Sequence, residues 1–465
     1  MLRRLLVLIA FSASKSSSAQ EIIVEKSIGW KGNAVQLNTI RNTEGNLHAT
    51  ILSNNDSFRI FLMGNQDTIE KEISLKRQNK EEIRGGFIAQ RKIYIFCGNI
   101  LPRGLHNYII DMDGGMISQH FVPSKISNDE VIDRASAGNC YMVFSLDKKT
   151  SEFIVSKWKN PDSAHVTRFP VHEGNIWNDL TVGSGFSREL QITKVDEAGL
   201  PDLSIVGNRR KLYIKHDSIF LLLNNNDGKT KVFVFDTKAN TMSVREMDQG
   251  SGQQWTNQNS SENSYLLDGK LYFVSATVDL LYISVSDFYT GKVLKDFTVA
   301  REDTISFKNT PIMQDGSLGL KELTKTRQLL RKMVKAKAVI AALNDSLGIS
   351  LIIGSNKEMS SGGGGGGGSF MNAAGPPGYT VYVPTGGFSS GSWTKSVRFR
   401  MQLDSVSLNH LPGEMESSIN DRIDDYTKDI KKPLNGENLF FQNGKYVYIY
   451  YDSGKRGLDF MHFNY

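Results

Sequence analysis

The chain has 465 residues, 39% of them hydrophobic and 10% aromatic, which is enough for a large folded core and excludes a wholly disordered polymer. The formal net charge is +6, but Arg3, Arg4 and Lys15 supply half of it: residues 20–465 carry 52 basic and 49 acidic side chains, a net charge of +3. Nucleic-acid binding needs a concentrated basic surface, so this near balance predicts no nucleic-acid partner.

Residues 1–19 have the layout of a secretory signal peptide. Arg3 and Arg4 precede the apolar run 5–11, and Ser17 and Ala19 stand at positions −3 and −1 of a cleavage before Gln20. The apolar run is far shorter than the roughly 20 residues that a bilayer-spanning helix needs. We therefore expect export to the periplasm or the extracellular space, without stable membrane insertion. The alternative is an ordinary N-terminal helix.

Short strand-like runs dominate the remaining chain. Runs of β-branched and aromatic residues, such as FRIFLM and KYVYIYY, alternate with turn sequences such as NNNDGK. The runs group into predicted units of about three or four strands, at 48–75, 82–123, 130–171, 203–247, 263–299, 335–408 and 438–465. The run EIIVEKSIGW at 21–30 stands before the first unit, and we hypothesise that it adds a strand to the last one.

Related phrases recur along the chain: AQRKIYIF at 89–96, GNRRKLYIK at 207–215, LDGKLYFV at 267–274 and QNGKYVYIYY at 442–451. A repeat of about 40–50 residues in an all-β chain is typical of a β-propeller, whose blades bury both faces of their strands against each other. In texture and repeat spacing the chain resembles secreted β-propeller proteins in general, without a WD, kelch or repeated Asp-box motif. We expect an all-β fold, a single β-propeller of seven blades over residues 20–465. Two stacked β-sandwiches are the alternative.

Cys97 and Cys140 lie in the apolar runs KIYIFCGN and GNCYMVFS. A cysteine in such a run behaves as a small buried hydrophobe, so we expect two free thiols. Export would also allow a disulfide between them, which is the alternative.

Residues 318–337 carry the one clear helical pattern. Leu323, Leu330 and Val334 repeat at helical spacing, and basic residues load the other side. We predict a short amphipathic helix inserted before the sixth blade and docked on it by its apolar stripe. Binding to a membrane surface or a partner is the alternative.

Seven consecutive glycines stand at 362–368. The strand-like runs on both sides are needed together to complete one blade, so we predict a mobile Gly-rich loop at 355–378, inserted within a blade. A phosphate-binding loop would need GxxxxGK[ST] followed by a helix, and the sequence has neither.

The search for chemistry predicts no catalytic residue, metal or cofactor. GFSSG at 387–391 has the GxSxG pattern, but a nucleophile at Ser389 needs a following helix, where a strand is expected. The histidines form no HxH or HExxH pair. Two acidic pairs, Asp111/Asp113 and Asp424/Asp425, stand in turn-like contexts.

Trp177 and Trp255 are the predicted ligand contacts. Each stands among polar residues, in GNIWNDL and SGQQWTNQNSS, where a flat apolar ring suits a sugar or a peptide. The alternative is a loop tryptophan packed against a blade edge.

Together these features predict an exported, non-enzymatic binding or scaffolding module for an extracellular glycan, peptide or protein partner. The alternative is an extracellular hydrolase or lyase with an active site at the propeller axis, because propeller enzymes assemble sites from distant loops. Convergent ionisable side chains at that axis would favour the enzyme.

Overall fold

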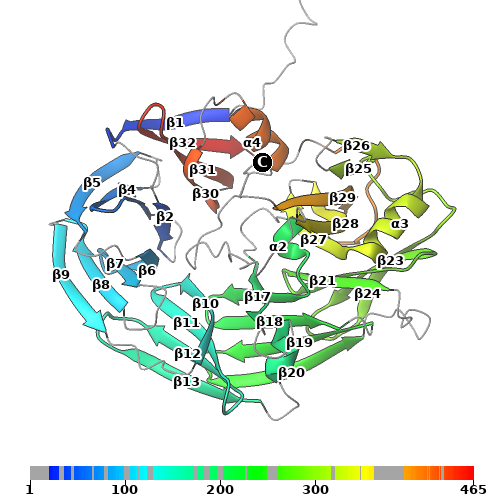
Figure 1. Cartoon of the computed structure of the whole chain (residues 1–465), viewed down its shortest axis with the longest axis horizontal. Helices are drawn as coiled ribbons and strands as arrows, with labels where there is room; N and C mark the ends of the chain where they lie inside the picture. Colours follow the sequence, from blue (N-terminus) through cyan, green and yellow to red (C-terminus); the bar gives the residue numbers. More distant parts are fainter. Residues whose placement is uncertain are drawn as a thin grey trace, which may run out of the picture. The chain divides into compact units, whose positions relative to one another are not determined.

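The computed structural model describes residues 20–464 except for 31–35, 43–46, 65–67, 78–81, 99–104, 114, 123–128, 172–175, 183–188, 196–202, 226–227, 249–259, 316–319, 346, 361–391, 416, 418, 429, 431–433 and 443. The predicted signal peptide at 1–19 lies outside the described residues. The chain forms two compact units, one from Met1–Lys80 and Ile423–Tyr465 and one from Glu81–Tyr379 and Val383–Arg422. The fold is all-β, and its four-stranded antiparallel sheets have the form of propeller blades (Figure 1).

The first unit holds two four-stranded sheets. One has the order β2-β3-β4-β5, with β2 (Gln36–Arg41), β3 (His48–Ser53), β4 (Ser57–Met63) and β5 (Ile69–Lys76). The other has the order β1-β32-β31-β30, with β1 (Gln20–Ser27), β32 (Gly457–Asn464), β31 (Lys445–Asp452) and β30 (Leu434–Gln442). Because β1 pairs antiparallel with β32, the hypothesis that the N-terminal run completes the last sheet is confirmed.

The second unit begins with two further four-stranded sheets. The first contains β6 (Glu82–Ala89), β7 (Lys92–Gly98), β8 (Leu105–Asp111) and β9 (Gly115–Val122). The second contains β10 (Asp129–Ala137), β11 (Cys140–Asp147), β12 (Glu152–Trp158) and β13 (Ala164–Pro170). A two-stranded sheet of β14 (Thr181–Val182) and β15 (Glu189–Leu190) follows.

Three larger sheets complete this unit. One contains β16 (Thr193–Lys194), β17 (Arg210–Lys215), β18 (Ser218–Asn224), β19 (Lys229–Asp236) and β20 (Thr241–Asp248). The next contains β21 (Ser261–Leu267), β22 (Lys270–Ala276), β23 (Leu280–Asp287) and β24 (Val293–Ala300). The last has the order β26-β25-β29-β28-β27, with β25 (Ile312–Asp315), β26 (Lys321–Leu323), β27 (Lys337–Asp345), β28 (Gly348–Ser360) and β29 (Ser392–Leu403).

Within the second unit neighbouring sheets contact each other: β6 contacts β10, β10 contacts β17, β18 contacts β21, and β21 contacts β27. We call β6, β10, β17, β21 and β27 the lead strands. The strands beside them are buried on both faces, as the apolar run SIFLLL in β18 predicted, whereas β20 and β24 at the far edges are mostly exposed or half-buried. The lead strands therefore take part in the contacts between neighbouring sheets.

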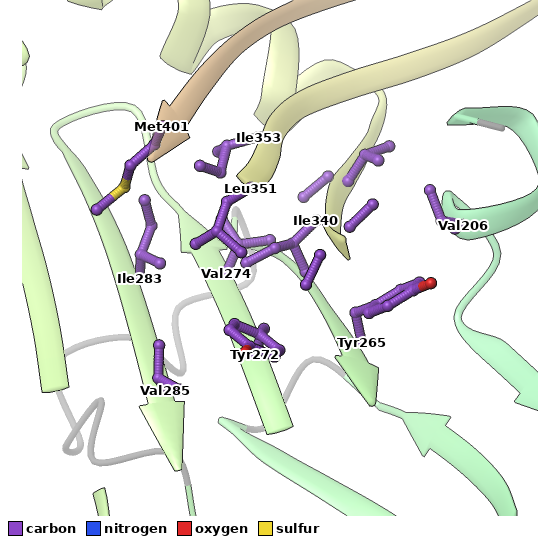
Figure 2. Close-up of a cluster of buried hydrophobic side chains, with 14 of the residues drawn as sticks. Val206, Tyr265, Tyr272, Val274, Ile283, Val285, Ile340, Leu351, Ile353 and Met401 are labelled. Carbon is purple, nitrogen blue, oxygen red and sulfur yellow. The ribbon is translucent and has the colours of Figure 1, made fainter. Parts of the chain in front are cut away.

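The core between the last two sheets shows how they pack. Figure 2 shows Tyr272 and Ile283 of one sheet facing Ile340, Leu351 and Met401 of the other, and all five side chains are almost completely buried. Burying one such leucine or isoleucine is worth about 1.5–3 kcal/mol. Continuous apolar contact of this kind supplies the main stabilisation between adjacent sheets.

The predicted amphipathic helix is present, but its position in the chain differs from the prediction. Helix α3 (Thr326–Lys335) buries Leu329, Leu330 and Met333 completely and contacts β27, so its apolar stripe docks on the sheet as expected. The helix begins eight residues later than predicted, however, and it lies between β26 and β27 of one sheet instead of before that blade. The pattern missed β25 and β26 because strands of four and three residues are too short to show a period.

Three more short helices had no sequence prediction. They are α1 (Ile176–Leu180), α2 (Leu203–Val206) and α4 (Ile419–Lys428). Asp424 and Asp425 lie in α4, so their predicted turn-like context is wrong.

The predicted Gly-rich loop at 355–378 begins too early. Residues 355–360 continue β28, and its pairing with β29 runs to Ser360 opposite Ser392. The backbone hydrogen bonds of this pair extend the strand beyond the apolar run, which is where the prediction had ended it. Residues 361–378 lie outside the described residues.

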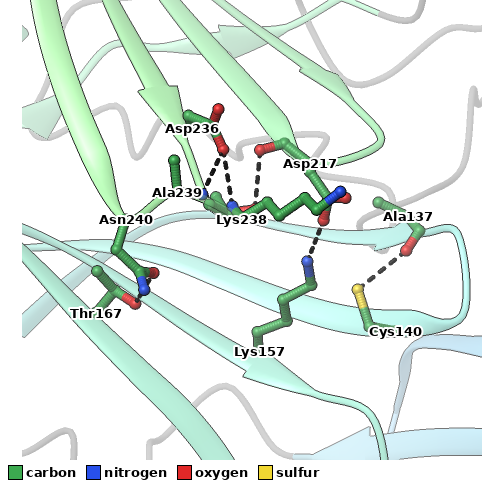
Figure 3. Close-up of polar contacts among 10 residues, drawn as sticks. Ala137, Cys140, Lys157, Thr167, Asp217, Asp236, Lys238, Ala239 and Asn240 are labelled. Carbon is green, nitrogen blue, oxygen red and sulfur yellow. Dashed lines mark hydrogen bonds and ion pairs between the residues drawn. The ribbon is translucent and has the colours of Figure 1, made fainter.

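Cys97 and Cys140 are buried free thiols, as predicted. Burial raises the pKa of Cys140 to about 11, and its Sγ donates to the Ala137 carbonyl oxygen at 3.0 Å. Figure 3 shows this thiol close to the ion pair between Lys157 of β12 and Asp217 of the β17–β18 turn, which joins two adjacent sheets. Cys140 is therefore a packing residue and a poor nucleophile.

Asn263 of β21 forms a fully buried polar junction. Its Nδ2 donates to the carbonyl oxygens of Val206 at 3.1 Å and Ala338 at 2.7 Å, and its Oδ1 accepts from the Ser264 amide at 2.9 Å and from Lys211 Nζ. Burial holds the pKa of Lys211 well below its ordinary value. One side chain thus connects α2 with three lead strands.

We predict that Asn263→Leu lowers the free energy of unfolding by about 2–4 kcal/mol, because the Lys211 amine and two carbonyl oxygens lose a buried partner. Urea unfolding followed by tryptophan fluorescence measures the change. The matched control is Lys211→Met, which removes the buried amine itself and is expected to cost less. An Asn263→Leu protein as stable as the parent would contradict this account.

His48 of β3 is completely buried in the first unit, with its ring 5.1 Å from that of Phe440. Burial lowers the pKa of His48 to about 3, and the nearby charges of Arg41 and His462 act in the same direction, whereas Gln442 opposes them. His48 is therefore neutral in the folded protein at all but strongly acidic pH.

Between pH 6.5 and about 3, the unfolded chain binds a proton at His48 that the folded chain does not, so folding stability falls as the pH decreases. Each pH unit in this window costs about 1.4 kcal/mol. We predict that His48→Gln lowers the stability lost between pH 7 and pH 4.5 by about 2–3 kcal/mol. Denaturant unfolding at both pH values measures the difference, and substitution of the exposed His165 is the control. An unchanged pH dependence would disprove the assignment.

Candidate functional site

Three of the lead strands carry charged residues among apolar or small ones. β6 reads EIRGGFIA, β10 reads DEVIDRASA and β17 reads RKLYIK. Charged residues inside strands that lie between packed sheets need partners or a function, because burying an isolated charge is costly. The candidate site is the group of charges near the beginning of β6, in the middle of β10 and on β16.

A β-bulge positions Arg84. Ile83 pairs with Cys97 and Gly85 with Phe96, so Arg84 is the extra residue of β6 and has no partner opposite it on β7. Its Nη2 lies 3.0 Å from Glu82 Oε2, and its Nε donates to the Gly98 carbonyl oxygen at 3.3 Å. Burial lowers the pKa of Arg84, as does the charge of Arg134, while Glu82 raises it.

Gly85 allows Tyr141 to approach this bulge. A Cβ atom at Gly85 would lie 2.6 Å from Tyr141 Cε2, so no other residue fits without displacing the ring. The Tyr141 ring stacks on Phe96 with 4.4 Å between ring centroids, and the side chain is completely buried. Its hydroxyl group has no hydrogen-bond partner among the residues that the structure describes. Burial raises the pKa of Tyr141.

A second bulge, at Ile132, presents Asp133 and Arg134 on β10. Burial raises the pKa of the Asp133 carboxyl, and the charges of Lys194 and Arg134 oppose the shift. Lys194 reaches this position because β16 pairs in parallel with β17, with Lys194 opposite Leu212. One carboxyl oxygen of Asp133, Oδ2, is buried and has no hydrogen-bond partner in the described part of the chain. We call Arg84, Asp133, Arg134, Tyr141 and Lys194 the ionic cluster.

The ionic cluster has unused hydrogen-bonding capacity. Among the described residues, the side chains of Arg134 and Lys194 make no hydrogen bond or ion pair, and both are half-buried. Tyr141 Oη and Asp133 Oδ2 have no hydrogen-bond partner within the described ranges either. Two free cations beside a hydroxyl donor suit an anionic group such as a carboxylate or a phosphate, and the carboxyl of Asp133 can bond a ligand hydroxyl.

Sequence reasoning missed this cluster, although a signal was present. EIRGGFIA and EVIDRASA each place an arginine inside an otherwise apolar or small-residue strand. The two arginines are 50 residues apart, and only the packing of β6 against β10 brings them together.

Of the two predicted ligand contacts, the structure describes Trp177 and does not describe Trp255. Trp177 lies in α1, half-buried against a hydrophobic cluster, with Lys148 Nζ 4.4 Å from its ring centroid. One face of its ring is thus used internally, and its role as a ligand contact stays a prediction. Trp255 and Ser389 lie outside the described residues.

Other motifs have structural roles. Asp113 forms an ion pair with Arg91, with its Oδ1 2.6 Å from Nη2, which agrees with a polar turn. Within the described part of the chain, no three histidine, cysteine, aspartate or glutamate side chains are close enough to hold a metal ion. The described residues include no helix long and apolar enough to cross a membrane.

Comparison with known proteins gives no family. No family model and no curated protein matches the chain. Similar solved structures include a cobalt-substituted Synechocystis apocarotenoid oxygenase, at 7% identity and a TM-score of 0.32 over 58% of this chain and 63% of that one. An ACO/RPE65 chimera has 8% identity and a TM-score of 0.31 over 57% and 62%. The dihydro-heme d1 dehydrogenase NirN in complex with DHE has 14% identity and a TM-score of 0.30 over 69% and 62%. The matches span less than two thirds of those structures, and at these TM-scores they assign neither fold nor activity.

Proposed function

We propose that this protein is an exported β-propeller of seven blades over residues 20–465 that binds an anionic group of an extracellular glycan, peptide or protein. The described residues supply seven sheets of four or five strands, one for each predicted unit. The signal-peptide layout of residues 1–19 supports export.

The unused donors of the ionic cluster carry the binding proposal. Arg134 and Lys194 are half-buried and have no hydrogen-bond or ion-pair partner in the part of the chain that the structure describes, so an anionic ligand would supply hydrogen bonds to partly desolvated positive charges. Arg84 is already engaged with Glu82 and Gly98, so Arg134 and Lys194 are the ligand-binding cations in this proposal.

We predict that a ligand with a carboxylate or phosphate raises the melting temperature of the protein, and that Arg134→Met and Lys194→Met each abolish most of this effect. Thermal unfolding with D-galacturonate, glucose 6-phosphate and neutral N-acetylglucosamine measures it. Lys149→Met, at an exposed turn, is the matched control. Equal stabilisation by the neutral sugar, or an undiminished effect in both variants, would contradict the proposal.

Asp133 favours a second candidate, a hydrolase or lyase acting at the same place. Burial raises the pKa of this carboxyl group, and a carboxyl group in a partly buried, charged surrounding has the chemistry of a general acid or base. We predict that, if the protein is an enzyme, Asp133→Asn preserves ligand binding and abolishes product formation from acidic oligosaccharides. Chromatography of the products over time distinguishes the two candidates, and an unchanged substrate with the parent protein supports the binding module.

A further inference from the structure

Positive charge is concentrated in one part of the second unit. Residues 316–403 contain eleven basic and three acidic residues, a net charge of +8, which exceeds the +6 of the entire chain. The nearly balanced total, which predicted no concentrated basic surface, therefore conceals a strongly basic segment. This segment includes α3, β28 and β29.

Six of these side chains share one surface, which we call the basic face: Lys321, Arg331, Lys332, Lys335, Lys357 and Lys395. Burial lowers the pKa of Lys332, and the nearby charges of Lys395, Lys321 and Lys335 lower it further. Lys357 and Lys395 stand directly opposite each other on β28 and β29. Arg331 and Lys335 lie one helical turn apart on α3, both exposed.

The basic face carries charge repulsion that nothing in the described structure relieves. Like charges opposite each other on paired strands, or one turn apart on a helix, are each destabilising. None of the six side chains forms an ion pair or hydrogen bond with any described residue. The undescribed neighbours at 316–319 and 361–391 contain no aspartate or glutamate, so the sequence supplies no counter-charge there. A local conflict of this kind marks a functional surface.

The residues of the basic face favour one kind of polyanionic ligand over others. Leu329, Leu330 and Met333, the apolar stripe of α3, are completely buried against the sheets, so the helix has no apolar face left to enter a bilayer. Five of the six cations are lysines, whose compact mobile charges suit carboxylates at varied spacing. We propose that the basic face binds an acidic polysaccharide, a choice over nucleic acid that rests on the export proposed above.

The test measures binding of the full mature chain to polygalacturonate by biolayer interferometry. Arg331→Gln/Lys335→Gln removes two charges at exposed helix positions and keeps good helix formers. We expect its affinity to fall about tenfold at low salt, with a weaker salt dependence than that of the parent. The control Lys149→Gln/Lys292→Gln makes the same change of charge at exposed turns of other sheets. Its affinity is expected to stay within about twofold of that of the parent, because salt screens charges that lie far from the basic face.

Three results would overturn the proposal. These are unchanged binding by the helix variant, equal binding of neutral dextran, and equal or tighter binding of duplex DNA or phosphatidylglycerol vesicles. A melting temperature like that of the parent shows that the variant is folded, and Lys395→Gln, on a strand, provides an independent second test. Arg134→Met is expected to retain polygalacturonate binding, so loss of the ionic-cluster ligand and loss of the basic-face ligand are separate outcomes.

Discussion

The hydrogen bonds around Asn263 are the constraint on which the second unit depends. Apolar packing between sheets is strong but not directional, so it leaves the relative position of two sheets poorly defined. The acceptors and donors around Asn263 meet in one arrangement only, which fixes α2 and the strands β17, β21 and β27 against each other. Because β16 pairs with β17 beside Lys211, the same junction also sets the position of Lys194 in the ionic cluster.

The second unit uses charge in two different ways. In the ionic cluster, Arg84 is held by Glu82, and the opposite charge of Asp133 lies near Arg134 and Lys194, so the surplus of positive charge is small. A small surplus in a partly buried place suits one anionic group held in a defined geometry. On the basic face most of the positive charges are exposed, and none has an opposite charge paired with it among the described residues, which suits a long and loosely held polyanion. The ionic cluster therefore suits a ligand with one anionic group, and the basic face suits a ligand with many.

The strand pattern could be predicted from the sequence, because β-branched and aromatic runs such as those in β18 and β31 must be buried on both faces. The pairing of β1 with β32 was anticipated from one short run for the same reason. The short strands β25 and β26 and the helices α1 and α2 carry too few residues for a period. The ionic cluster depends on two bulges and on a contact between β6 and β10, and neither has a local signature.

The pairing of β1 with β32 also governs the order in which the molecule is completed. The two strands are separated by more than 400 residues, so this sheet stays incomplete until β32 has been synthesised. Until then β1 is an unpaired strand whose backbone groups are available to another molecule. β1 thus waits for a partner that lies far along the chain, and during that interval its exposed edge is open to incorrect pairing.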